Sequence, residues 1–143
     1  MNIAIASDHA GVAHKKALVE FVESMGHHVD DLGPYSIDSV DYPSYAHKLS
    51  EKIKNREAEF GILLCGTGNG VAMTANKHNG IRAGLAWNKE VAALIRQHND
   101  ANILVMPARF TTVEEAKEIT KTYLETPFEG GRHQRRIDMI TLL

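Results

Sequence analysis

Cysteine and long hydrophobic runs are scarce in this sequence. A single cysteine, Cys65, stands among 143 residues, which excludes an intrachain disulfide and a cysteine-based zinc cluster. No apolar stretch approaches the roughly 20 residues that a membrane span needs. The amino terminus has no basic segment and reaches Asp8 after a very short apolar run, which argues against a signal peptide. We therefore expect a cytoplasmic protein that does not enter membranes.

An excess of charge of either sign is also missing. The chain has 16 Lys and Arg residues against 18 Asp and Glu residues, a formal net charge of -2. Proteins that bind nucleic acid or anionic membranes normally carry a basic excess, so we expect neither kind of partner. With 43% hydrophobic residues the chain can bury a core, and its length suits a single domain over residues 1–143.

Short apolar runs alternate with amphipathic segments along the chain. The runs predict buried strands over residues 3–6, 27–32, 60–65, 81–86 and 103–106. Apolar residues spaced by three and four predict the helices between them, with Gly26 ending the first, Asn88 capping a later one and Thr112 opening another. This alternation indicates an α/β fold, an open, doubly wound (Rossmann-like) parallel sheet of five strands with a helical tail at the carboxyl terminus.

A glycine-rich loop follows the run 60–65. It consists of Gly66, Thr67, Gly68, Asn69 and Gly70. Glycines let backbone N–H groups converge, and a following helix adds positive potential, so such a loop binds a phosphate or a negative oxygen that develops during a reaction. The Lys-Ser/Thr of a P-loop is missing, and no dinucleotide fingerprint follows the first strand. A tight strand-to-helix turn would use the same glycines.

Cys65 lies between this strand and this loop. A lone cysteine in an apolar strand is usually an inert core residue. At the edge of an amide-lined loop, however, N–H groups and the positive end of a helix stabilise a thiolate. Cys65 is therefore a candidate catalytic base or nucleophile.

Candidate acid–base groups flank two of the predicted strands. Ligands of open α/β sheets bind beyond the carboxyl ends of the strands. Asp8 and His9 follow the first strand, and His98 and Asn99 lie between the fourth helix and the fifth strand. We expect these groups at the binding edge, together with Arg109, which follows the fifth strand.

The carboxyl-terminal tail is locally basic. Arg132 and Arg136 are four residues apart, so a helix would place both on one face. Two guanidinium groups on one face suit a phosphate, with each charge-assisted bond contributing about 1.5–3 kcal/mol. A solvated helix face would have the same composition. A tail beyond the last sheet helix could also reach a neighbouring subunit.

Five blocks occur in order along the chain: SDHAG (7–11), CGTGNG (65–70), ANKHNGIRA (75–83), RQHND (96–100) and EGGRHQRR (129–136). In this combination the sequence resembles the ribose-5-phosphate isomerase B family, which also contains the subunits of galactose-6-phosphate isomerase. The resemblance implies an aldose–ketose isomerase without metal or other cofactor. It further implies interconversion of ribose 5-phosphate and ribulose 5-phosphate through a cis-enediolate, in the pentose phosphate pathway, by a homodimer or a dimer of dimers with shared sites.

The resemblance also implies catalytic roles. Cys65 would move a proton between C1 and C2. The Thr67 hydroxyl, which the loop sequence alone places near Cys65, is a candidate to assist its ionisation. His98 would open the furanose ring, and Asp8 would assist it or bind the substrate by orienting the sugar hydroxyls. In part of the family a Glu after the glycine loop replaces the cysteine, but Val71 stands at that position here.

Binding roles follow from the same resemblance. The N–H groups of residues 66–70 would face the enediolate oxygen, and Asn99 would contact sugar hydroxyls. Four side chains would bind the phosphate: His9, Arg109, Arg132 and Arg136. His98, Asn99 and Arg109 would come from a different subunit than Cys65.

Three alternatives stay open. The substrate could be a hexose 6-phosphate of the allose or galactose type, since one extra carbon changes only the distance to the phosphate. A non-catalytic sugar-phosphate sensor would explain the loop and the arginines, but not Cys65. A cysteine-based phosphatase would place an Arg within the loop, and none follows Cys65 there.

Overall fold

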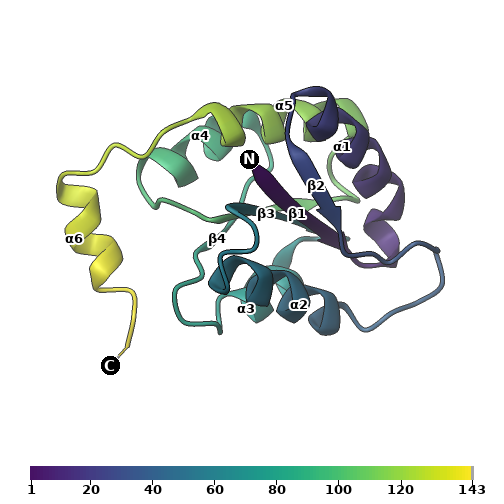
Figure 1. The fold of residues 1–143 in the computed structure, drawn as a ribbon, viewed down its shortest axis with the longest axis horizontal. Coiled ribbons are helices and arrows are strands. Elements are labelled where there is room, and N and C mark those ends of the chain that lie inside the picture. The colour runs from purple at the N-terminus through teal and green to yellow at the C-terminus, as the bar shows by residue number, and fades with distance from the viewer. Residues whose placement is uncertain (143) are drawn as a thin grey trace.

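The computed structural model describes residues 1–142 and confirms the α/β fold expected from the sequence (Figure 1). In this part of the chain five parallel strands form one sheet: β1 (Asn2–Ser7), β2 (His28–Asp31), β3 (Phe60–Cys65), β4 (Ala83–Leu85) and β5 (Ile103–Pro107). The strand order is β2-β1-β3-β5-β4. The largely buried strands β1, β3 and β5 lie in the centre, and the partly exposed β2 and β4 form the edges.

Helices follow or precede every strand. Their bounds are η1 (His9–Gly11, a 3-10 turn), α1 (Val12–Ser24), α2 (Tyr42–Lys54), α3 (Asn69–Ala75), α4 (Lys89–Gln97), α5 (Val113–Glu125) and α6 (Arg132–Asp138). The predicted end signals are confirmed. Gly26 adopts a positive φ of 91° after α1, the Asn88 side chain accepts a hydrogen bond from the Val91 N–H, and Thr112 and Glu115 form a capping box.

The sheet carries a helical layer on each face (Figure 1). Alternate residues of a strand point to opposite faces. Ile3 and Ile5 therefore join the core under α1, α4 and α5, whereas Ala4 and Ala6 join the core under α2 and α3. Cys65 belongs to the α2 and α3 side. This orientation directs its side chain toward the segment that connects β3 to α3.

The strands all end at one edge of the sheet. Cys65 pairs with Pro107 in the register of β3 and β5, and Ser7 pairs with Leu64 in that of β1 and β3. The segments after β1, β3 and β5 are therefore neighbours. Helix α6 stands apart from both layers, at the end of the molecule next to α4 (Figure 1). None of the helices within residues 1–142 is long and apolar enough to cross a membrane.

Candidate active site

The Cys65 sulfur faces the glycine loop. Its Sγ accepts a hydrogen bond from the Gly68 N–H at 3.1 Å, while the residue is only 6% exposed. Gly68 adopts a φ of 81°, and a Cβ there would lie 2.5 Å from Leu85 Cδ1. Glycine is thus needed both for the backbone conformation and for the close approach of its amide. The buried thiol therefore has a backbone N–H donor directly beside it, as the sequence predicted.

Asp8 and His9 directly follow β1, the strand that pairs with β3. The Asp8 N–H donates to the Leu64 carbonyl at 3.0 Å, which places it beside the end of β3. One oxygen of the Asp8 carboxylate, Oδ1, accepts from the N–H groups of Ala10 and Gly11 at 2.9 and 3.2 Å and so caps η1. His9 Nδ1 accepts from the Val40 N–H at 3.3 Å, which leaves the proton on Nε2 for donation to a ligand.

Arg109 and Tyr42 complete this edge. The Arg109 N–H donates to the Gly66 carbonyl at 3.0 Å, and a Cβ added at Gly66 would lie 3.1 Å from Arg109 Nη1. Arg109 therefore covers the loop of its own chain, which corrects the expectation that it reaches Cys65 from another subunit. The Tyr42 ring packs at Gly70, where an added Cβ would lie 2.6 Å from Tyr42 Cε1. Sequence reasoning missed Tyr42, because nothing local links it to the loop.

A second group of candidate residues lines a separate cavity of about 370 Å³ between α4 and α6. Its polar walls are His98, Asn99, Arg132, His133 and Arg136. The prediction that Arg132 and Arg136 lie together is thus confirmed.

The predicted place of His98 and Asn99 in the sheet is wrong. His98 is the carboxyl cap of α4 and precedes β5, so it lies at the amino-terminal edge, opposite Cys65. The five residues of β5 separate the two edges by roughly 13 Å. Within one chain the structure therefore brings Asp8, His9, the glycine loop and Arg109 to Cys65, but not His98, Asn99, Arg132 or Arg136.

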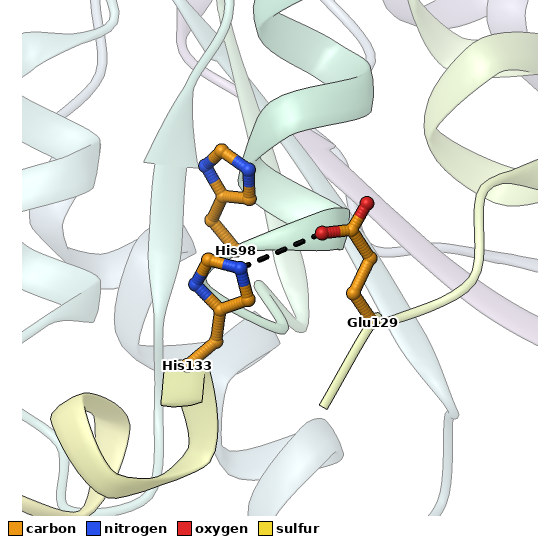
Figure 2. Close-up of side chains that lie close together, drawn as sticks. All are labelled: His98, Glu129 and His133. Atoms are coloured by element: carbon orange, nitrogen blue, oxygen red, sulfur yellow. Dashed lines mark ion pairs between the residues drawn. The ribbon is translucent and has the colours of Figure 1, made fainter. Parts of the chain in front are cut away.

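His98 stacks on His133 inside this cavity (Figure 2). Their ring centroids are 4.4 Å apart and their planes differ by 15°. Glu129 Oε1 lies 3.5 Å from His133 Nε2. Burial lowers the pKa of His133, and the charge of Arg132 lowers it further. Sequence reasoning gave His133 and Glu129 no role, although both lie in the block EGGRHQRR.

Two imidazoles and a carboxylate are also the donors that a zinc ion takes. The donor atoms of His98, Glu129 and His133 all lie within 4.8 Å of one another. However, nearly parallel stacked rings direct their in-plane lone pairs side by side rather than toward one point. Arg132 and Arg136 add positive charge to the same cavity. The two rings would have to turn before they could share an ion.

Comparison with known proteins identifies the family. The sequence profile described as Ribose/Galactose Isomerase matches residues 3–140. The chain belongs to this family. Ribose-5-phosphate isomerase B of Escherichia coli is 40% identical over 141 residues, which cover 99% of this chain and 95% of that protein. The family and the aldose–ketose isomerase class predicted from the sequence are confirmed.

Solved structures agree with this assignment. A ribose 5-phosphate isomerase RpiB from Thermotoga maritima superposes with a TM-score of 0.95 at 51% identity, covering 97% of this chain and 96% of that one. Ribose-5-phosphate isomerase B from Mycoplasma genitalium, solved with bound ribulose-5-phosphate, superposes with a TM-score of 0.93 at 48% identity, covering 97% and 93% of the two chains.

Proposed function

We propose that this chain interconverts ribose 5-phosphate and ribulose 5-phosphate, with Cys65 as the base. The observation that carries the role of Cys65 is its sulfur 3.1 Å from the Gly68 nitrogen, at the start of a glycine loop. The similarity to the Mycoplasma genitalium enzyme with bound ribulose-5-phosphate supports the choice of sugar. Isomerisation needs a base on one face of the sugar and N–H donors facing the oxygen that becomes negative.

The reaction begins with ring opening. The His98 imidazole takes the proton from the O1 hydroxyl and delivers a proton to the ring oxygen O4. The C1–O4 bond breaks and C1 becomes an aldehyde. An imidazole suits both transfers, because its ordinary pKa lies near neutrality.

The second stage moves the hydrogen between carbons. The Cys65 thiolate takes the proton from C2, and the electron pair forms the C1–C2 double bond while O1 becomes an oxyanion. The N–H groups of the glycine loop stabilise this enediolate. A proton passes from O2 to O1, and the Cys65 thiol returns its proton to C1, which leaves the ketose. His9 and Arg109 lie at the same edge and are placed to hold polar groups of the sugar phosphate.

The two groups of residues require a second copy of the chain. A pentose phosphate is shorter than the distance across β5, so no single chain offers Cys65 and His98 to one substrate. We propose a homodimer in which the cavity of one copy, with His98, Asn99, Arg132 and Arg136, covers the Cys65 loop of the other. Near α6, Met139, Ile140 and Leu142 are 74%, 59% and 93% exposed, which supports an apolar contact there. A cytoplasmic location stays a prediction.

Ketose formation tests the reaction and the substrate. The enzyme should convert ribose 5-phosphate with higher kcat/KM than allose 6-phosphate or galactose 6-phosphate. The Cys65→Ala variant should bind ribose 5-phosphate but lose isomerisation. Equal or faster turnover of a hexose phosphate would overturn the choice of substrate. Binding without turnover by the unmodified protein would favour a sensor, and release of inorganic phosphate would favour a phosphatase.

A further inference from the structure

His133 is one of two buried residues of α6, together with Ile137 one turn further along the helix. It is 6% exposed, whereas its neighbours Arg132 and Gln134 lie on the surface. Its ring lies against His98 on one side, and its Nε2 points toward Glu129 without a hydrogen-bond partner within residues 1–142 (Figure 2). A buried polar nitrogen without a hydrogen-bond partner costs stability, so the position of His133 calls for a functional reason.

The segment before α6 holds His133 in this place. The Glu129 N–H donates to the Gln97 carbonyl at 3.1 Å, so the tail is attached to the last residue of α4. His98 directly follows Gln97 in the chain. The backbone N–H of His133 donates to the Gly130 carbonyl. Backbone hydrogen bonds on both sides, and not side-chain packing alone, therefore hold the His98 and His133 rings in contact.

We propose that His133 is a positioning residue for ring opening: its ring forms the plane against which the His98 imidazole is held while His98 exchanges protons with O1 and O4 of the sugar. This inference rests on the proposed function, in which His98 opens the ring. His133 itself touches no reacting atom and takes no proton.

The charges around His133 fit this role. Burial disfavours a proton on the ring most strongly, and the charges of Arg132, His98 and Arg136 add to this effect. Glu129 alone favours a proton, so the pKa of His133 is lowered. A neutral His133 leaves His98 free to become an imidazolium briefly, since a cation is stabilised over the face of a neutral aromatic ring. Glu129 favours the tautomer with the proton on Nε2.

Two readouts separate ring opening from the proton transfer at carbon. Ribulose 5-phosphate cannot close to a furanose, because its O5 carries the phosphate. Deuterium uptake at C1 of ribulose 5-phosphate in D₂O therefore reports on proton transfer by Cys65 without ring opening, whereas conversion of ribose 5-phosphate needs both steps. A residue that acts through His98 should affect the second readout and spare the first.

The test variants are His133→Leu, which removes the aromatic ring stacked on His98, and His133→Phe, which keeps an aromatic ring there. The matched controls are His28→Leu and His28→Phe, at an exposed position of β2. We expect His133→Leu to lower kcat on ribose 5-phosphate about 10- to 100-fold. Deuterium uptake should stay close to that of the unmodified enzyme. His133→Phe should recover most of the lost kcat, and both controls should match the unmodified enzyme.

Three results would overturn the inference: an equal loss of both readouts in His133→Leu, a loss of neither, or a His133→Phe variant as slow as His133→Leu. Failure of the proposed function looks different, since the unmodified enzyme would then show neither isomerisation nor deuterium uptake.

Discussion

Replacing Gly68 with alanine changes the residue whose backbone N–H donates to the Cys65 sulfur. Gly68 has a φ of 81°, and an added Cβ would lie 2.5 Å from Leu85 Cδ1 and 3.2 Å from Val105 Cγ1. The left-handed conformation costs a residue with a side chain about 1–2 kcal/mol, and an extra methyl group in a packed site costs about 1–3 kcal/mol more. We expect the free energy of unfolding to fall by about 2–5 kcal/mol.

The same substitution should also slow the reaction. Relief of the clash moves the loop away from β4 and β5 and displaces the Gly68 N–H from the sulfur. Hydrogen bonds to charged groups contribute about 1.5–3 kcal/mol, which corresponds to a loss of about 10- to 100-fold in kcat/KM if the N–H supports the thiolate. Urea unfolding and steady-state kinetics measure the two effects separately.

Gly80→Ala is the matched control. Gly80 has a φ of 85°, but a Cβ there would meet nothing within 4 Å. This variant has the backbone strain without the steric clash. Its free energy of unfolding should therefore fall by only about 1–2 kcal/mol, and its kcat/KM should stay unchanged. If Gly68→Ala is no less stable and no slower than Gly80→Ala, the close packing of the loop against Leu85 is not what holds the donor at the sulfur.

Three further predictions concern other parts of the chain. Arg136→Met should raise KM for ribose 5-phosphate about 10- to 100-fold in steady-state assays; an unchanged KM would remove Arg136 from the phosphate site. Tyr123→Phe removes the 2.8 Å hydrogen bond to the Ala101 carbonyl, which keeps its bond from Arg96, so urea unfolding should show a loss of only about 0.5–1.5 kcal/mol; a much larger loss would contradict this. Burial lowers the pKa of His78, so its contribution to stability is complete above about pH 6.5 and is lost as the pH falls. His78→Asn should flatten the stability profile in that acidic range, and a profile of unchanged slope would refute the assignment.

Local signals predicted most of the fold. The central strands are apolar throughout and the helix ends carry strong caps, so the elements at Cys65, Asn88 and Thr112 were found from a few neighbouring residues. The position of β5 between β3 and β4 in the sheet was not predictable in this way. It depends on which strand is buried on both faces, and that is decided by packing across the whole sheet.

The site was predictable only where it is contiguous in sequence. Cys65 and its loop are consecutive residues, so their geometry follows from the chain itself. His98 was placed at the wrong edge, because a segment that precedes a parallel strand lies opposite the segments that follow the strands. His133 was overlooked because its stacking partner is distant in sequence, and only the folded tail brings the two rings together.

Mixing two inactive variants tests the shared site most directly. Cys65→Ala and His98→Asn would be purified separately, combined in mild denaturant and returned to buffer, with native mass spectrometry to count hybrid dimers. A hybrid has one site with both Cys65 and His98, so random reassociation should restore about one quarter of the unmodified activity. If hybrids form and the mixture stays inactive, Cys65 and His98 of different copies do not act on the same sugar, and the proposed shared site is wrong.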